Sequence, residues 1–209
     1  NNLSENTIVI ATTDHGPGFP DMKRTLSDRG TGVMLAIRGP EFTGGKVCDA
    51  MVTHMDLFPT LCDMLGVDNP DWLQGESILP LMRGETESIH DVIFTEQSWH
   101  GDYCPLRAVQ SERYKYIKRF DVNAKRGIDR GPTQVLWEDH GWQEIPQDEE
   151  EFYDLLFDPN ERNNLVGNEH YQDALEDMRA RLQDWLESTN DPILTDSIPK
   201  PLMLDTSAL

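Results

Sequence analysis

The chain has 209 residues, which is enough for one large domain or two small ones. With 38 acidic and 18 basic residues its formal charge is −20, and this excess of acid argues against nucleic acid and against anionic membranes as main partners. No apolar run approaches the roughly 18 residues that a membrane span needs. The three cysteines form no CxxC pair, so the sequence indicates neither a disulfide framework nor a thiolate zinc site.

The first part of the chain has the pattern of an α/β sheet. Thr7–Ala11 and Gly32–Ile37 are short apolar runs of the kind found in fully buried strands of a parallel sheet. The first run ends in the loop Thr12–Gly18, where glycine and proline force a turn. Because ligands bind at the carboxyl ends of strands in open α/β sheets, this loop is where chemistry is expected.

A helix is predicted further along. Asp56 can cap a helix that runs to Leu65, and Gly66 can end it. The apolar residues of this segment recur at helical spacing on one face. The following segment, Asn69–Arg83, holds prolines and a glycine and is expected to be a loop.

The character of the chain changes near His90. We predict short strands separated by turns, at Val92–Thr95, Leu106–Gln110, Arg113–Lys118 and Phe152–Leu155. A helix is predicted at about His170–Ser188, with its apolar residues on one face. Between the third and fourth strands, Val122–Glu151 is polar and is expected to be a long excursion that ends in a solvated acidic turn. The tail from Asn190 is rich in proline and is expected to wrap a surface without regular structure.

These patterns predict an α/β fold in two parts. Residues 1–89 are expected to belong to an α/β sheet, and residues 90–209 to form a small antiparallel sheet packed against one helix. Two core strands cannot make a doubly wound sheet alone, so further strands are expected upstream of Asn1.

The sharpest chemical feature is the pair Asp14-His15 on the glycine loop after the first strand. A carboxylate and an imidazole at a strand end are suited to binding a metal ion. Aspartate and glycine also occur in turns for backbone reasons alone, so the dipeptide by itself leaves both interpretations open.

Other residues could carry chemistry. Lys23 and Arg24 are adjacent cations beside this potential metal site, which indicates an anion site, although solvated side chains are the commoner case. Cys104 with Arg107 has the residues of an activated thiol, but the pattern favours a small buried residue that enters a strand. His100 lies in a polar and aromatic loop that could contact a sugar or merely close a turn.

The order of several segments resembles the C-terminal half of a sulfatase. In the first part the matching segments are Asn6–Ile10, Thr13-Asp14-His15-Gly16, Lys23, Met55–Leu61 and Gly75–Leu81. In the second part they are Leu106–Val109, Arg113–Ile117, Phe152–Leu155, Asp158–Glu161 and Asn164-Leu165. Each is weak alone, but they stand in the family's order from about Asn6 to Pro192. The chain looks most similar to sulfamidases, which cleave an N-sulfate from glucosamine, at Gly16–Pro20, Cys104–Val109 and Trp185–Pro192.

The resemblance implies the alkaline-phosphatase-like α/β sandwich with a C-terminal antiparallel subdomain. In this family a cysteine or serine in a Cys/Ser-x-Pro-Ser-Arg motif becomes formylglycine, whose hydrate attacks sulfur while a divalent metal, usually calcium, polarises the sulfate. The sequence has no such motif and lacks the two N-terminal aspartates of the family's metal site. The nucleophile is therefore expected in an upstream segment of the same gene product, and the 209-residue chain alone is expected to be inactive.

The resemblance implies a limited set of site residues here. Asp14 takes the position of the family's metal-binding aspartate, and His15 takes the next position, where many members have asparagine. Calcium is expected, with manganese or zinc left open because imidazole also suits them. Lys23 resembles the cation that binds the sulfate and stabilises its developing charge, with Arg24 as the alternative if the loop is shifted by one residue.

His100 and Arg107 fall near the family's substrate cleft and are candidate substrate contacts. The implied substrate is a sulfated small molecule or glycan, and members of the family are usually exported, periplasmic or lysosomal. Two other functions stay open: a phosphonate or phosphate ester hydrolase of the same superfamily, and a non-catalytic module that binds metal or sugar. An unrelated acidic scaffold protein would not explain the ordered motifs.

Overall fold

The computed structural model describes residues 3–100, 102–127, 131–195 and 198. The chain forms two compact units. The first unit combines the chain up to Asp14 with Val33–Ile93, and the second combines His15–Gly32 with the chain from Phe94 onward. The division expected from the sequence, 1–89 and 90–209, differs from these units in the segment His15–Gly32 and at residues 90–93.

The two strands of the first unit run in opposite directions. β1 (Val9–Thr12) and β2 (Leu35–Arg38) pair antiparallel, with Thr12 opposite Leu35. Both runs were expected to be fully buried strands of a parallel sheet. This was wrong, because the two strands pair antiparallel with each other and several of their residues are exposed in the structure. A short apolar run indicates a strand but does not set the direction of its neighbour.

The helix predicted after Asp56 is confirmed. A 3-10 turn, His54–Asp56, leads into α2 (Leu57–Leu65), and Gly66 ends the helix in the left-handed region at φ 64°. Asp56 is fully buried, and its carboxylate accepts the N–H groups of Thr53 at 2.6 Å and Glu76 at 2.9 Å. The Asp56 side chain makes no capping hydrogen bond to α2, contrary to the expectation, and instead joins the turn before the helix to the loop that follows it.

A short helix lies where a loop was expected. α3 (Leu79–Arg83) begins with Pro80 in its first turn, where the missing N–H of proline costs little. Leu79 is buried with Phe42 and Ile78 in the core of the first unit. A 3-10 turn, Ser4–Asn6, precedes β1. These elements account for the regular structure described in the first unit.

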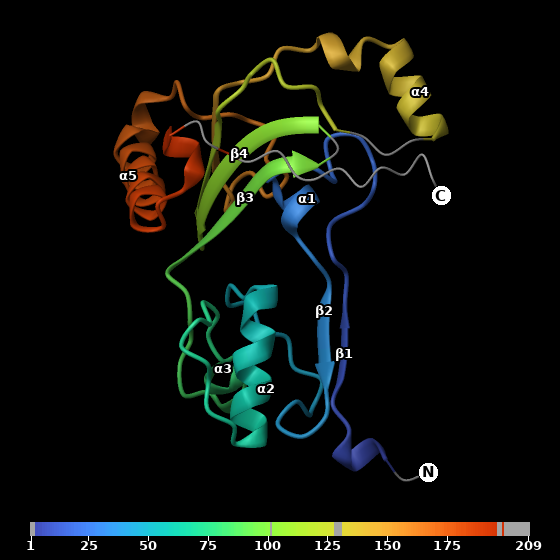
Figure 1. Ribbon diagram of the computed structural model, residues 1–209, viewed down its shortest axis with the longest axis vertical. Helices are drawn as coiled ribbons and strands as arrows, with labels where there is room; N and C mark the ends of the chain where they lie inside the picture. Colours follow the sequence, from blue (N-terminus) through green and yellow to red (C-terminus); the bar gives the residue numbers. More distant parts are fainter. Residues whose placement is uncertain (1–2, 101, 128–130, 196–197, 199–209) are drawn as a thin grey trace. The chain divides into compact units, whose positions relative to one another are not determined.

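The second unit is built on a four-stranded sheet of order β3-β4-β5-β6, of which β3 and β4 are labelled in Figure 1. The strands are β3 (Val92–His100), β4 (Asp102–Ser111), β5 (Tyr114–Arg119) and β6 (Glu150–Asp154). All four predicted strands are confirmed, and β3 and β4 extend further than expected. β5 pairs antiparallel with both β4 and β6.

One face of this sheet is covered by α5 (Gln172–Ser188), which follows a 3-10 turn at Glu169–Tyr171 (Figure 1). The predicted helix and its apolar face are confirmed, because Leu175, Met178, Leu182 and Leu186 are all buried. Phe94 of β3 stacks on Trp185 of α5 with ring centroids 4.9 Å apart. The helix therefore supplies the apolar layer that a small sheet needs.

The opposite face carries a second core. Alternation along the strands directs Cys104, Leu106, Ala108, Ile117 and Tyr153 to this face. Leu26, from the segment His15–Gly32, joins this core, and α1 (Asp28–Thr31) is a single helical turn of the same segment. The loop that carries Lys23 and Arg24 is therefore built onto the sheet face opposite α5.

The long polar excursion is more ordered than expected. Its described part contains α4 (Pro132–Asp139) and the 3-10 turn Trp142–Glu144, and Trp142 is buried. A solvated turn was expected at Asp148–Glu151. This prediction was wrong for Glu150 and Glu151, which lie in β6 and pair with arginines. A final 3-10 turn spans Pro192–Thr195, and most of the predicted wrapping tail lies outside the described residues.

Among the helices that the structure describes, none combines the length and apolarity required to cross a membrane.

Candidate functional site

Asp14 stands in the first unit, in the bend that follows β1. Thr13 holds this bend to the start of β2, because its N–H donates to Met34 O at 3.2 Å and its hydroxyl accepts the Met34 N–H at 3.1 Å. Asp14 is exposed. The strand end therefore presents a carboxylate at an accessible position.

His15 begins the second unit, and Gly16 closes the base of the loop that follows. The Gly16 N–H donates to Gly30 O at 2.9 Å. A Cβ atom at position 16 would lie 1.8 Å from Arg29 O, so only glycine fits at this close approach. The imidazole is half-buried, with Nδ1 2.6 Å from Gly16 O. The glycine beside His15 is thus required by the packing of the loop.

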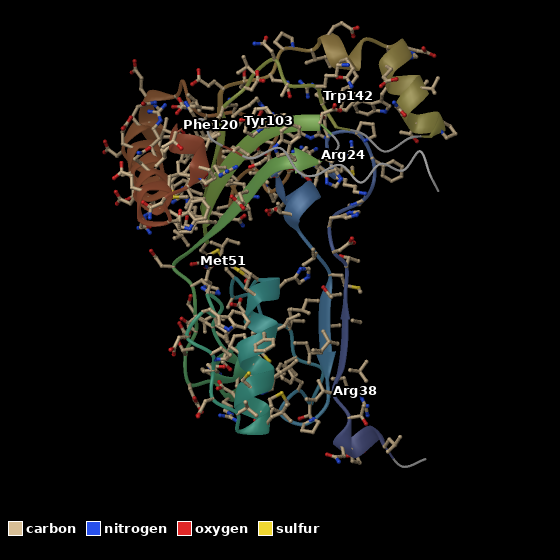
Figure 2. The ribbon with its side chains drawn as sticks, in the orientation of Figure 1. Arg24, Arg38, Met51, Tyr103, Phe120 and Trp142 are labelled. Carbon is tan, nitrogen blue, oxygen red and sulfur yellow. The ribbon has the colours of Figure 1, made fainter. Side chains whose placement is uncertain are left out.

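Lys23 and Arg24 lie on consecutive tight turns of this loop. The Lys23 N–H donates to Pro17 O at 3.1 Å, and the backbone of Arg24 adopts φ 69°, a left-handed conformation that is uncommon outside glycine. Arg24, labelled in Figure 2, lines a cavity on the sheet, and Lys23 is not among the lining residues. The two adjacent cations therefore have different surroundings.

A buried lysine fastens the loop to the sheet. Lys115 of β5 is 2% exposed at its side chain, and its ammonium contacts the carboxylates of Asp28 and, at 2.8 Å, Glu161. The other Glu161 oxygen accepts the Asp28 N–H at 2.8 Å. Burial raises the pKa of the Glu161 carboxyl and outweighs the opposing effect of Lys115. This cluster could have been found from the sequence, because Lys115 shares one face of its strand with the apolar Ile117.

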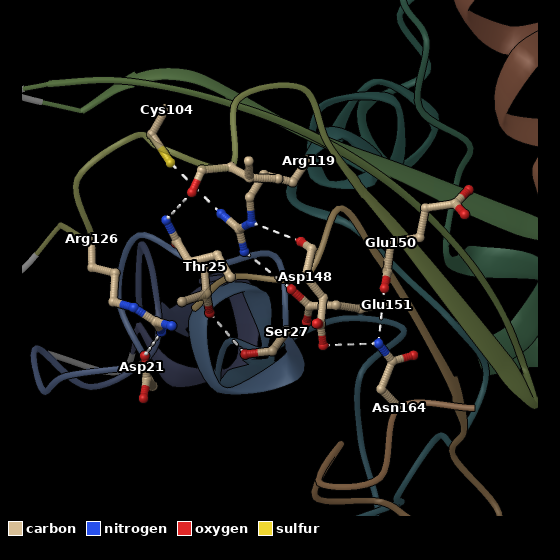
Figure 3. A network of polar contacts seen from close by, with 12 residues as sticks. Asp21, Thr25, Ser27, Cys104, Arg119, Arg126, Asp148, Glu150, Glu151 and Asn164 are labelled. Carbon is tan, nitrogen blue, oxygen red and sulfur yellow. Dashed lines mark hydrogen bonds and ion pairs between the residues drawn. The ribbon is translucent and has the colours of Figure 1, made fainter. Parts of the chain in front are cut away.

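Asp21 provides a second attachment. Its carboxylate pairs with Arg126 Nη1 at 3.1 Å and accepts the Trp142 indole N–H at 3.1 Å. The Arg126 guanidinium also lies over the Trp142 ring, 5.7 Å from its centroid. Figure 3 shows the Asp21–Arg126 pair beside the hydrogen bond between Thr25 and Ser27. Because both attachments flank Lys23 and Arg24, they fix the backbone on which the two cations stand.

Arg107 lies elsewhere in the second unit. Its side chain is 1% exposed and binds Asp191 through two hydrogen bonds of 2.6 and 2.9 Å. Further donors go to the Gln97 and Leu106 carbonyls and to the Ser98 hydroxyl. Burial raises the pKa of Asp191, but the hydrogen bonds from Arg107 and from the Ile193 N–H, together with the charge of Arg107, outweigh burial, so the pKa lies below its usual range. In this structure Arg107 ties β4 to the segment after α5.

The other two candidates are also placed. His100 is exposed at the end of β3, next to residue 101, which lies outside the described residues. Cys104 is buried in β4, as the sequence favoured, and its sulfur lies 3.9 Å from Arg119 Nη1. Burial raises the pKa of the Cys104 thiol and outweighs the effect of Arg119. A protonated, buried thiol is a poor nucleophile.

The described residues contain no group of three or more histidine, cysteine, aspartate or glutamate side chains close enough to hold a metal ion. Asp14 and His15 are chemically suited as ligands, one through a carboxylate oxygen and the other through an imidazole nitrogen. Among the described residues, Asp14 and His15 therefore supply at most part of the coordination shell of a metal ion.

A comparison with protein families decides what kind of chain this is. The family model described as N-sulphoglucosamine sulphohydrolase, C-terminal, matches residues 17–130, which is more than half of the chain. The chain belongs to this family. It matches the C-terminal portion of sulfatases and is most similar to sulfamidase-type members, so the predicted family is confirmed.

Individual sulfatases match over nearly the whole chain. Human N-sulphoglucosamine sulphohydrolase is 29% identical, over 89% of this chain and 42% of its own length. The Delta 4,5-hexuronate-2-O-sulfatase of Bacteroides thetaiotaomicron is 31% identical, over 89% of this chain and 36% of its own length.

A solved 2-O GAG sulfatase superposes with a TM-score of 0.73 at 28% identity, over 93% of this chain and 39% of its own. The alkaline-phosphatase-like fold is thereby confirmed. The chain spans between 36% and 42% of the length of these sulfatases.

Proposed function

We propose that the protein containing this chain is a sulfatase that hydrolyses a sulfate ester or sulfamate of a sulfated sugar. The observation that carries this proposal is the chain's membership of the family described as N-sulphoglucosamine sulphohydrolase, C-terminal. The geometry is consistent with it, because the loop from His15 to Arg24 carries an imidazole and two cations on a backbone fixed by Lys115 and Asp21. A sulfate group is an anion, and a chain with a net charge of −20 needs local cations to receive it.

In this proposal Lys23 binds the sulfate group and stabilises the negative charge that develops on its oxygens during hydrolysis. Arg24 is the alternative cation. His100, exposed at the end of β3, contacts the sugar. Arg107 has its donors engaged within the fold, so we assign it to positioning β4 rather than to binding substrate.

We further propose that Asp14 and His15 supply two ligands to a divalent metal, calcium or, because of the imidazole, manganese or zinc. Calcium takes about six to eight oxygen ligands, so other ligands must come from residues outside this pair. When bound, the metal would offset the negative charge of the sulfate. Asp14 would contribute its carboxylate from the bend after β1, and His15 its ring nitrogen from the next residue.

The nucleophile is proposed to lie outside this chain, as a formylglycine formed from a Cys/Ser-x-Pro-Ser-Arg motif. The 209 residues contain no such motif, and Cys104, whose sulfur lies near Arg119, is buried with a raised thiol pKa. We therefore propose that the isolated 209-residue chain releases no sulfate.

The test is a substrate panel applied to the protein purified at the length the cell makes it. The panel contains N-sulfated and O-sulfated glucosamine, an aryl sulfate, a phosphate diester and a phosphonate monoester. We expect sulfate release from at least one sulfated sugar, and slower turnover of the phosphorus substrates. Turnover of the phosphonate alone would move the function to phosphorus chemistry, and no turnover together with metal binding would indicate a binding module.

The proposed metal ligands are tested separately by calorimetry with calcium, manganese and zinc. Asp14→Ala is expected to abolish the metal binding that the parent protein shows. Asp68→Ala, a control at an exposed aspartate, is expected to bind metal as the parent does. Absence of metal binding by the parent protein, or unchanged binding by Asp14→Ala, would contradict the assignment.

A further inference from the structure

A cavity of about 180 Å³ lies in the second unit, on the sheet face opposite α5. Its walls come from the segment Asp21–Arg29, from β4, β5 and β6, and from the loops that follow β5 and β6. Five arginines line it: Arg24, Arg29, Arg119, Arg126 and Arg162. In a chain with only 18 basic residues and a net charge of −20, this is a strong local concentration of positive charge.

Three carboxylates also line the cavity, and each is matched by its own cation. The pairs are Glu151 with Arg119 at 3.1 Å, Asp21 with Arg126 at 3.1 Å, and Glu161 with Lys115 at 2.8 Å. Within the parts of the chain that the structure describes, no carboxylate lies at ion-pair distance from Arg29 or Arg162. The cavity therefore keeps an excess of positive charge after its acids are paired.

Guanidinium nitrogens of the cavity that are buried without a hydrogen-bond acceptor among the described residues include Arg29 Nε and Arg126 Nε. A buried donor is normally satisfied by protein, water or a ligand. Arg29 stands in α1 directly after Asp28, which Lys115 and Glu161 hold to the sheet, so the backbone that carries its guanidinium group is held in place. The Arg126 guanidinium is held through its Nη1 atom by Asp21.

Hydroxyl groups also line the cavity, but they are engaged with the protein. The Thr25 hydroxyl donates to Met22 O at 2.8 Å, and the Ser27 hydroxyl, 2.8 Å from Thr25 Oγ1, donates to it (Figure 3), so the guanidinium groups are the donors left for an anion. Guanidinium groups bind oxyanions through charge-assisted hydrogen bonds. Donors that come from separate elements suit a tetrahedral oxyanion, which accepts hydrogen bonds from several directions, better than a planar carboxylate.

We propose that this cavity binds a sulfate group, as inorganic sulfate or as a sulfate carried by a sugar, with Arg29 as its main cation and Arg162 at its exposed rim. Lys23, the first cation proposed for catalysis, does not line the cavity, whereas its alternative Arg24 does, so this site is distinct from a catalytic site centred on Lys23. The inference does not depend on catalysis, because it concerns binding alone.

The test is titration of sodium sulfate into the protein at its natural length, by calorimetry and by thermal unfolding, with sodium chloride at the same ionic strength as reference. We expect one sulfate per chain at the cavity, and a rise in Tm that chloride does not give. Arg29→Gln should weaken this binding about tenfold or more, which corresponds to the loss of one charge-assisted contact. Arg83→Gln, at an exposed arginine of the first unit that pairs with Glu41, should bind sulfate as the parent does.

Arg162→Gln provides a second variant if Arg29→Gln fails to fold, since Arg162 is exposed and should weaken binding without unfolding the chain. Glucosamine carrying a sulfate, compared with unsulfated glucosamine, distinguishes the two sources of the group. If the sulfated sugar binds more tightly than inorganic sulfate and Arg29→Gln loses this binding, the group is carried by a sugar. If inorganic sulfate binds more tightly than the sulfated sugar, the ligand is the free ion.

Two results would overturn the proposal. One is a sulfate effect on Tm no larger than that of chloride. The other is full sulfate binding in both Arg29→Gln and Arg162→Gln together with its loss in Lys23→Gln, which would place the ion at the proposed catalytic loop instead.

Discussion

Lys115 and Glu161 form an ion pair of 2.8 Å in which both side chains are almost completely buried. The same glutamate accepts the backbone N–H of Asp28, so one carboxylate joins the middle of the sheet to the segment His15–Gly32. Lys23 and Arg24 stand on that segment. The position of the proposed sulfate-binding loop therefore depends on a charge cluster in the interior of the second unit.

Removing the ammonium group of Lys115 should destabilise the fold. Lys115→Met leaves the carboxylates of Glu161 and Asp28 together without their cation, and we expect it to lower the free energy of unfolding by about 3–5 kcal/mol. The double variant Lys115→Met/Glu161→Gln should recover a large part of that loss, because it removes one of the two uncompensated charges. Chemical denaturation of the single and double variants measures both effects.

Lys118 gives a matched control on the same strand. It pairs with the exposed Glu149, so Lys118→Met should cost at most about 1 kcal/mol. Equal losses for the variants at positions 115 and 118, or a double variant less stable than Lys115→Met, would refute the role assigned to the buried pair.

The pair of Arg107 with Asp191 predicts a pH dependence of stability. The pKa of folded Asp191 lies below its ordinary value of 3.8, so the pair contributes fully above about that pH and is lost as the pH falls through the folded pKa. Asp191→Asn should cost about 3 kcal/mol at neutral pH, because it leaves the buried Arg107 guanidinium with the largely exposed Glu96 carboxylate, at 3.3 Å, as its anion. Denaturant midpoints between pH 7 and pH 2 should fall less steeply below pH 4 in Asp191→Asn than in the parent protein. Parallel curves for the two proteins would be inconsistent with this pair.

Gly16 predicts a steric effect next to His15. Gly16→Ala would place a Cβ atom 1.8 Å from Arg29 O, so the base of the loop must open. We expect a loss of about 2 kcal/mol or more, in the range of a backbone clash, and a loss of any activity that depends on Lys23. Gly167→Ala is the control, because nothing lies within 4 Å of a Cβ atom there. Thermal unfolding of both variants checks the comparison, and equal Tm values would contradict it.

The second unit could be predicted well because its signals are local. The apolar face of His170–Ser188 and the alternation of Arg113–Lys118 each follow from the period of one element. The direction of β1 against β2 could not be predicted, since it depends on where the intervening segment goes. That segment is held by Asp28, Asp21 and Glu161, whose partners are distant in sequence.

The same difference between local signals and partners distant in the sequence applies to the candidate site. Asp14, His15, Lys23 and Arg24 were found because they are close together in sequence at the end of a strand. Their supports were missed, because Lys115 and Trp142 are distant in the sequence from the loop that they hold. Arg107 was selected for its charge, and the structure shows that this charge is matched by Asp191, a partner that no spacing rule predicts.

The measurement that tests the account most directly is the rate of sulfate release by Lys23→Gln, in the protein at its natural length, from the best substrate of the panel. We predict a fall in kcat/KM of about 10²–10³, the loss expected when one charge-stabilising group is removed from an active site. Lys125→Gln, at an exposed lysine of the same unit, should keep the parent rate. A Lys23→Gln enzyme that releases sulfate as fast as the parent would contradict the proposal that this loop receives the sulfate group.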